Sequence, residues 1–260
     1  MNRLIQTITK QSKNLLNIYC TAGYPKLEDT TEILKALQNA GADIIEIGIP
    51  FSDPLADGPT IQQSNGVALA NGISIPKLFE QLKDVRQTVT VPLILMGYLN
   101  PVLQYGFEAF CQQCNAIGID GLIIPDLPLH EYTSKYKPIF EQNKLSNICL
   151  ITPKTSVERI KEIDEQSSGF IYAVSSSSTT GTKQKAISNN HFFEQLKAMD
   201  LNNPVLIGFN IKDNATFTNA CNYANGAIIG SAFIRAIENT ENLEGDIKKF
   251  VNKVRDETKI

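Results

Sequence analysis

The sequence has no block of one charge and no long apolar run. Its 260 residues carry a net charge of -3 with no cluster of Lys or Arg, which argues against nucleic acid as a main partner. No apolar run approaches the roughly 18 residues that a membrane-spanning helix needs. The first ten residues lack a signal-like apolar core and a small-residue cleavage site. We therefore expect a cytoplasmic protein, or one of the plastid stroma if the gene is plastid-encoded, with no membrane partner.

Histidine and the common nucleophile motifs are also scarce. His130 and His191 are the only histidines, and both fall at predicted helix starts, so no metal set can be assembled. No Gly-x-Ser-x-Gly occurs. Lys154 comes nearest to a Schiff-base lysine, but Pro153 and Thr155 mark it as part of a loop. These absences favour acid-base chemistry by carboxylates over metal or covalent aldolase chemistry.

Cysteine is present in an odd number, mostly within apolar segments, and this usage indicates a reducing environment. The five are Cys20, Cys111, Cys114, Cys149 and Cys221. The Cys-x-x-Cys pair lies on a predicted helix with no second pair nearby. We interpret both of its members as buried helix-face residues.

Eight short apolar segments alternate with helical patterns, and this alternation predicts the fold class. We expect strands at about Leu15–Thr21, Asp43–Pro50, Pro92–Tyr98, Gly121–Asp126, Asn147–Thr152, Gly169–Ser175, Val205–Phe209 and Ala227–Gly230. Eight such units without a break in composition predict an α/β protein, a single (β/α)8 TIM barrel over residues 1–260 with an additional N-terminal helix. An open doubly wound sheet is the alternative, but no Gly-x-Gly-x-x-Gly follows the first strand.

The helices fall between these strands, with one long polar interruption. We expect them at about Leu27–Asn39, from Pro59, at Ile75–Val89, Gly106–Ile117, Pro128–Asn143, Ser156–Gln166, His191–Met199, Ser231–Ile237 and Leu243–Arg255. Residues Ser175–Asn190, after the sixth strand, are rich in hydroxyl residues. We interpret them as a long mobile loop that serves as an active-site lid, although a plain linker is the simpler alternative.

The stretch Ile44–Pro59 carries the strongest chemical signal. Ile45 and Ile47 alternate with Glu46, so one strand face suits packing under helices and the other carries a carboxylate. A barrel lumen desolvates such a group and raises its pKa toward the range useful for proton transfer. Asp57 follows in a loop rich in Pro, Gly and Asp. We therefore expect Glu46 and Asp57 to converge on one small molecule, although an inward carboxylate is often a satisfied core ion pair.

Glycines at the ends of the last two strands indicate an anion site. TIM barrels commonly hold phosphate with the loops after strands seven and eight. Here those loops contain Gly208 and Asn210, then Gly230 and Ser231, and Ser231 can start a helix whose free amides face an anion. Gly181 could add another amide. Each glycine alone is most simply a turn residue.

Several motifs together resemble the tryptophan synthase alpha chain family across nearly the whole sequence. The most specific is E-I-G-I-P-F-S-D-P-L-A-D-G-P from Glu46 to Pro59. Supporting it are Thr21-Ala22-Gly23, then Met96, Tyr98, Asn100 and Pro101, then Pro125-Asp126-Leu127-Pro128, Thr180-Gly181 and Gly230-Ser231.

The resemblance implies a retro-aldol cleavage of indole-3-glycerol phosphate to indole and glyceraldehyde 3-phosphate, without a cofactor in this chain. The position matching Glu46 protonates indole C3 and then helps remove the glycerol hydroxyl proton. The position matching Asp57 holds the indole N–H and stabilises the positive charge on the ring nitrogen. Thr180, in the lid, is expected to close onto Asp57 and exclude water.

The resemblance also implies binding residues and a partner. The indole ring is expected among Tyr19, Ile61, Met96, Ile123, Leu150, Tyr172, Phe209 and Ile228. The phosphate maps to amides of Gly181, Asn210, Gly230 and Ser231. The expected partner is the pyridoxal-phosphate-dependent beta chain in an α2β2 tetramer, with Asp53 at the interface.

Two departures from the family pattern affect the expected phosphate site and lid. Asn210 replaces the usual glycine, and Asn adopts positive φ more readily than most residues. Ser176 and Ser178 replace the usual Arg and Gly of the lid. We expect an active enzyme with altered lid dynamics.

Three alternatives share much of this evidence. A stand-alone indole-3-glycerol phosphate lyase would use the same catalytic residues. Another phosphate-binding barrel, such as an indole-glycerol phosphate synthase or a phosphoribosyl isomerase, would need a strand-end lysine or an opposed Asp pair, and neither is found. A non-catalytic activating subunit would not need Glu46 and Asp57.

Overall fold

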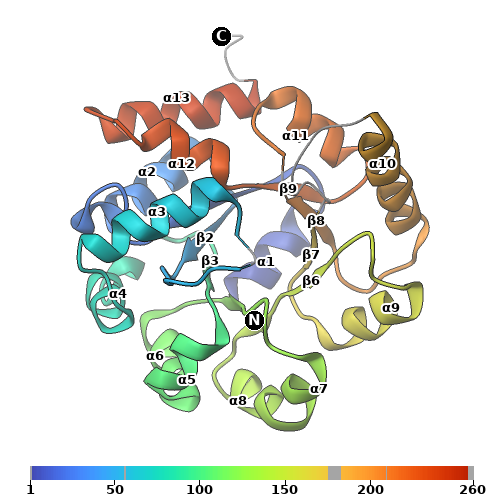
Figure 1. The fold of residues 1–260 in the computed structure, drawn as a ribbon, viewed down its shortest axis with the longest axis horizontal. Helices are drawn as coiled ribbons and strands as arrows, with labels where there is room; N and C mark the ends of the chain where they lie inside the picture. The colour runs from blue at the N-terminus through green and yellow to red at the C-terminus, as the bar shows by residue number, and fades with distance from the viewer. Residues whose placement is uncertain (1, 56, 175–182, 209, 257–260) are drawn as a thin grey trace.

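Parallel strands form a ring at the centre of the molecule, and helices surround that ring (Figure 1). The structure is a computed structural model that describes residues 2–55, 57–174, 183–208 and 210–256. The strands are β1 (Leu15–Thr21), β2 (Ile44–Gly48), β3 (Leu93–Met96), β4 (Gly121–Ile123), β5 (Ser146–Asn147), β6 (Cys149–Ile151), β7 (Ile171–Val174), β8 (Val205–Gly208) and β9 (Gly226–Ile229). Their order in the sheet is β5-β4-β3-β2-β1-β9-β8-β7-β6.

The two ends of this sheet meet at one divided strand. β5 pairs with β4 and β6 pairs with β7, and only Ile148 separates β5 from β6. The amide of Ile148 donates to the carbonyl of Leu122 at 3.0 Å, which continues the β4 ladder across the break. Residues 146–151 therefore fill one position of an eight-position barrel. The predicted TIM barrel is confirmed, with the predicted strand Asn147–Thr152 split in two.

Alternation along the strands produces two separate cores. Ile45 and Ile47 of β2 pack outward into the layer between strands and helices, as predicted. The lumen holds a second cluster of side chains. Its buried members are Leu4, Leu15, Ile44, Ile94, Ile123, Ile148, Phe170, Tyr172, Leu206 and Ile228. The lumen is therefore a packed core in its lower part, as in other barrels of this type.

The helices lie largely where the sequence predicts them. They are α1 (Arg3–Lys10), α2 (Thr30–Ala40), α3 (Pro59–Ala70), α4 (Ile75–Leu82), α5 (Leu99–Tyr105), α6 (Phe107–Ile117), α7 (Leu129–Glu131), α8 (Lys137–Gln142), α9 (Val157–Gln166), α10 (Lys183–Ala198), α11 (Asn214–Cys221), α12 (Ser231–Ile237) and α13 (Leu243–Arg255). A 3-10 turn, Leu27–Asp29, precedes α2, and another, Val85–Gln87, follows α4. A π-helical turn, Tyr132–Tyr136, joins α7 to α8. Within the described ranges, every helix is too short or too polar to span a bilayer.

Three helices differ from the ranges expected from the sequence, and one of them, α11, lies outside every predicted helix. Helix α5 lies outside the predicted helices, and Pro101 is compatible with it because proline is tolerated in the first turn. Helix α10 begins at Lys183, so the prediction of an irregular loop over Ser175–Asn190 is wrong from Lys183 onward. Lys, Gln and Ala, which favour helix, open this segment and outweigh the Ser and Asn further along. His191 consequently lies inside α10 rather than at its start, and residues 175–182 lie outside the described part of the chain.

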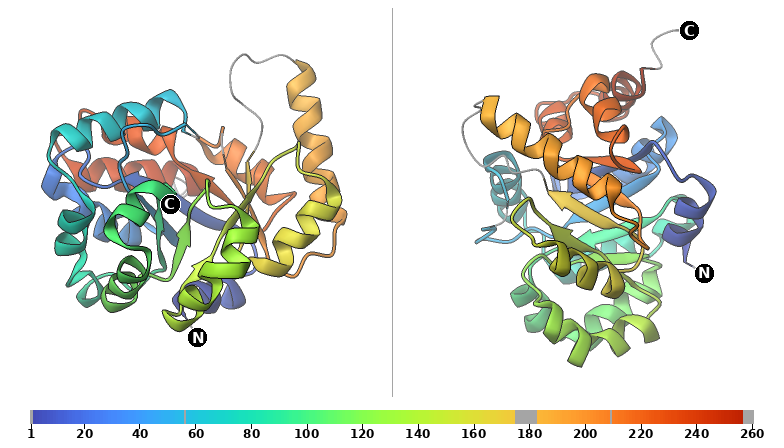
Figure 2. Two further views of the ribbon diagram at one scale, coloured as in Figure 1. Left: turned by 60° about the horizontal axis from the view of Figure 1, so that its bottom comes forward. Right: turned by 90° about the vertical axis from the view of Figure 1, so that its right-hand side faces the viewer.

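The N-terminal helix α1 closes the end of the barrel where the strands begin (Figure 2). Asn2 caps it by accepting from the amide of Ile5 at 3.0 Å. Leu4 is fully buried in the lumen cluster, and Ile8 packs against that cluster. The predicted N-terminal helix is therefore present and shields the lower lumen from water.

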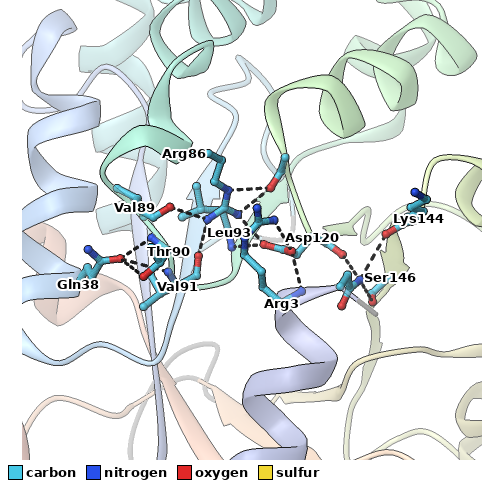
Figure 3. A network of polar contacts seen from close by, with 12 residues as sticks. Arg3, Gln38, Arg86, Val89, Thr90, Val91, Leu93, Asp120, Lys144 and Ser146 are labelled. Carbon is cyan, nitrogen blue, oxygen red and sulfur yellow. Dashed lines mark hydrogen bonds and ion pairs between the residues drawn. The ribbon is translucent and has the colours of Figure 1, made fainter.

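Asp120 ties α1 to the lower rim of the barrel (Figure 3). Its carboxyl is buried and accepts from Arg86 Nη2 at 2.6 Å and from the Leu93 amide at 3.0 Å. Arg3 donates to the other oxygen through its amide at 3.1 Å and its guanidinium at 3.4 Å. Arg86 also donates to three backbone carbonyls at this rim. Burial lowers the pKa of Arg86 to about 10, and Asp120 opposes that shift.

We predict that Arg86→Met destabilises the fold far more than Arg3→Met. Removing Arg86 leaves the Asp120 carboxylate buried without its closest cation, which costs about 3–5 kcal/mol in comparable cases. Arg3 is 43% exposed and makes the longer contact, so its removal should cost below about 1 kcal/mol. Urea unfolding of both variants measures the two free energies. Equal losses would contradict the assignment of Asp120 and Arg86 as the main tie.

Candidate active site

Glu46 projects from the middle of β2 into the lumen and is fully buried. Asn17 of β1 donates through Nδ2 to Oε1 of Glu46 at 2.5 Å. The other oxygen, Oε2, has no hydrogen-bond partner among the described residues. Burial raises the pKa of Glu46 to about 8, against the opposing effect of the Asn17 hydrogen bond. The carboxyl is therefore protonated at neutral pH and can give up a proton.

Asp57 lies in the loop between β2 and α3 and is half-buried. The Tyr98 hydroxyl donates to its Oδ2 at 3.3 Å. Burial raises the pKa of Asp57 to about 6, while hydrogen bonds from Tyr98 and Asn65 pull it down. At neutral pH this carboxyl is therefore ionised, in contrast to that of Glu46.

Two buried tyrosines lie within electrostatic range of both carboxyls. Burial raises the pKa of Tyr19 well above its usual value, and the charges of Asp57 and Glu46 add to that rise. For Tyr172, burial again comes first, followed by Glu46 and Asp57. Tyr19 and Asp57 also line a small shared pocket with Met96, Tyr98 and neighbouring residues. The structure thus brings the two predicted carboxyls to one region at the upper end of the lumen.

Each tyrosine ring depends on a glycine in a neighbouring strand. A Cβ at Gly48 of β2 would overlap the hydroxyl of Tyr19. A Cβ at Gly208 of β8 would overlap the ring of Tyr172. The two glycines therefore leave the space that both rings occupy.

The residues expected around the indole ring divide into three groups. Ile123, Tyr172 and Ile228 are buried in the lumen cluster, and Met96 and Leu150 pack against it partly exposed. Ile61 of α3 and Tyr19 both flank Gly230, since a Cβ there would lie 3.7 and 3.6 Å from them. Phe209 lies outside the described residues.

The predicted phosphate residues are described only in part. Asn210 has φ of 60°, a conformation that Asn adopts more readily than most residues. Gly230 is the N-cap of α12 and Ser231 is its first residue, as the sequence predicts. Gly181 and the lid residues Thr180, Ser176 and Ser178 fall outside the described residues. The binding roles of these positions stay predictions.

Sequence reasoning missed two polar residues of the site. Asn17 stands within L-L-N-I-Y-C-T and shares the inward parity of Tyr19, a signal that the strand pattern contains. Asn65 of α3 is buried and hydrogen-bonds Asp57, but no local pattern marks it. Cys111 and Cys114 are fully buried on α6, as predicted. In the described ranges, no group of three His, Cys, Asp or Glu side chains is placed to hold a metal ion.

Comparison with known proteins identifies the family. The sequence model of the tryptophan synthase alpha chain matches residues 5–259. The chain belongs to the tryptophan synthase alpha chain family. Members of this family cleave indole-3-glycerol phosphate in tryptophan biosynthesis, so the chain is a carbon-carbon lyase.

Individual relatives agree in both sequence and structure. The tryptophan synthase alpha chain of Christiangramia forsetii is 56% identical over 256 residues, covering 98% of this chain and 99% of the relative. That of Flavobacterium psychrophilum is 53% identical, covering 98% and 100%. The crystal structure of the alpha subunit from Legionella pneumophila has a TM-score of 0.87 at 33% identity, covering 98% of each chain. A structure of tryptophan synthase from M. tuberculosis has a TM-score of 0.85 at 29% identity, again covering 98% of each chain.

We predict that Gly48→Ala impairs catalysis whereas Gly66→Ala does not. The new methyl at position 48 must displace the Tyr19 ring, and a displacement of about 1 Å in an active site costs on the order of 100-fold in rate. A Cβ at Gly66, on α3, would meet nothing within 4 Å, and alanine favours helix there. Steady-state cleavage assays give kcat/KM for both. A Gly48→Ala enzyme with parental kcat/KM would contradict the role given to the Tyr19 ring.

Proposed function

We propose that Glu46 is the proton donor and acceptor of the cleavage reaction. Breaking the bond between indole C3 and the glycerol side chain first requires a proton at C3, which makes that carbon sp³. A carboxyl with a pKa of about 8 holds this proton at neutral pH. As the carbon-carbon bond breaks, its electron pair restores the indole ring and the adjacent hydroxyl becomes the aldehyde carbonyl. The hydroxyl proton passes to the Glu46 carboxylate, so the enzyme ends the cycle in its starting state.

Asp57 supplies the complementary negative charge. Protonation at C3 places positive charge on the indole ring nitrogen, and an ionised carboxylate that accepts the ring N–H stabilises that charge. A pKa of about 6 keeps Asp57 ionised at neutral pH. The observation that carries this proposal is the placement of a fully buried Glu46 and a half-buried Asp57 beside the same two tyrosines.

The remaining parts of the substrate have their own proposed contacts. The indole ring is held by the apolar residues around the upper lumen, and the phosphate by backbone amides at Gly181, Asn210, Gly230 and Ser231. Closure of Thr180 onto Asp57 would keep water from the reacting atoms. Acid-base chemistry of this kind needs no cofactor in this chain, and pyridoxal phosphate belongs to the proposed partner.

We further propose a beta chain as the partner, in an α2β2 tetramer in the cytoplasm. Asp53 lies on the exposed loop before α3, and Leu55 in the same loop is 94% exposed. Single exposed leucines are common on protein surfaces, so the assignment of Leu55 to the interface rests on its place beside Asp53, which the resemblance puts there. A stand-alone lyase would have the same catalytic residues but would not bind a beta chain. A non-catalytic activating subunit would have the same interface but would not cleave the substrate. Binding and activity assays therefore distinguish the two alternatives.

We predict a bell-shaped pH profile for kcat/KM of the cleavage reaction. Activity should fall as the pH rises through about 8, because Glu46 then loses the proton that it must donate. Activity should fall as the pH drops through about 6, because Asp57 is then neutralised. Glu46→Gln should reduce turnover by at least about 100-fold, in line with the size of general acid-base contributions. A Glu46→Gln enzyme with full turnover would favour the non-catalytic subunit instead.

We predict co-elution with a beta chain in size-exclusion chromatography, together with a higher cleavage rate. Leu55→Asp should weaken binding by roughly 10- to 100-fold, because burying a leucine side chain is worth about 1.5–3 kcal/mol. Leu69→Asp is the matched control, since Leu69 is 37% exposed at the far end of α3. No co-elution with full cleavage activity would identify a stand-alone lyase. If Leu55→Asp and Leu69→Asp weakened binding equally, the assignment of Leu55 to the interface would be wrong.

A further inference from the structure

Asn17 occupies a lumen position that its neighbours fill with isoleucine. It lies on β1, two residues before Tyr19 on the same strand face, and is fully buried. Its register partners are Ile44 on β2 and Ile228 on β9. A primary amide at this level loses its hydration and needs hydrogen bonds in return. Packing alone would therefore favour an aliphatic side chain here.

The hydrogen bond to Glu46 explains why an asparagine, and not an aliphatic residue, occupies this position. Nδ2 of Asn17 donates to Oε1 of Glu46 at 2.5 Å, while Oδ1 of Asn17 has no hydrogen-bond partner among the described residues. An N–H group can only donate, so the Glu46 oxygen that it meets acts as an acceptor. In the protonated carboxyl, the hydrogen is then carried by the other oxygen, Oε2.

We propose that Asn17 is a positioning residue for Glu46, holding Oε1 so that Oε2 is the atom that exchanges the proton with the substrate. The inference rests on the proposed role of Glu46 and adds to it the orientation of the carboxyl. Oε2 is buried and meets no hydrogen-bonding partner in the described part of the chain, so the bond from Asn17 fixes which oxygen stays available.

Asn17 is the residue that hydrogen-bonds Glu46, whereas the titratable tyrosine and cysteine side chains near Glu46 are neutral. Tyr19 and Cys20 on β1 and Tyr172 on β7 are the titratable groups that interact with Glu46. Burial raises the pKa of all three, that of Cys20 to about 12, so they are neutral at pH 7. Asp57 adds negative charge beside the same tyrosines. The Asn17 bond favours the carboxylate, so removing it should raise the pKa of Glu46 and make it a weaker proton donor.

The test compares Asn17→Leu with Ile44→Val in otherwise intact protein. Asn17→Leu removes the donor at similar volume, and Ile44→Val perturbs packing at the same level without a bond to Glu46. We expect Asn17→Leu to stay folded and to lower kcat by roughly 10- to 100-fold with KM little changed, the size of a lost hydrogen bond to the carboxylate that Glu46 becomes during the reaction. The alkaline limb of the kcat/KM profile should move up by about one pH unit.

A direct titration separates this inference from the proposed function. Carbon-13 NMR of labelled glutamate side chains follows the Glu46 carboxyl, whose titration midpoint should rise in Asn17→Leu and stay unchanged in Ile44→Val. An unmoved midpoint and an unchanged kcat in Asn17→Leu would overturn the role of Asn17, and so would equal effects of the two variants. Full turnover in Glu46→Gln would instead overturn the proposed function itself.

Discussion

Desolvation of one carboxyl in the barrel lumen is the constraint on which the site depends. Glu46 is fully buried, and burial is the largest influence on its pKa. That environment exists because the strand ring is continuous across Ile148 and because α1 covers the lower opening with Leu4 in the lumen core. Asp120, which Arg86 holds at the lower rim, accepts from the amide of Arg3 and so ties this cover to the rim, far from the chemistry. The contacts that stabilise the lower rim therefore also keep the lumen closed, and the closed lumen raises the pKa of Glu46.

The different positions of Glu46, in β2, and Asp57, in the loop after β2, give the two carboxyls different protonation states. Glu46 lies within a strand, where its neighbours are lumen side chains and one amide. Asp57 lies further along the chain, in a loop where it is half-buried and hydrogen-bonded by Tyr98. Burial acts on both groups, but more completely on the first. This difference in burial lets a neutral acid and a charged carboxylate coexist beside Tyr19 and Tyr172.

Much of the fold and the core of the site followed from local pattern. Alternation placed Ile45 and Ile47 outward and Glu46 inward, the acidic loop after the strand indicated Asp57, and the family resemblance supplied the roles of the two carboxyls. The helical start at Lys183 was missed because hydroxyl residues on both sides suggested a loop, although the residues that open the segment favour helix. Asn17 was missed because a single asparagine in an apolar strand carries no motif. Its meaning comes from the register of β1 against β2, which brings it diagonally to Glu46, and register is a property of the folded sheet.

Space at the upper end of the lumen comes from glycines rather than from a missing layer of strands. Barrels of this type usually fill each level with side chains from alternate strands. Here Gly48 leaves space for the Tyr19 ring and Gly208 leaves space for the Tyr172 ring. Two aromatic rings therefore occupy this level, whereas smaller aliphatic side chains fill the level below. The rings bring apolar surface and two hydroxyls next to both carboxyls. Glycine at these two strand ends therefore lets two tyrosine rings pack over the strands in the region where Glu46 is fully buried.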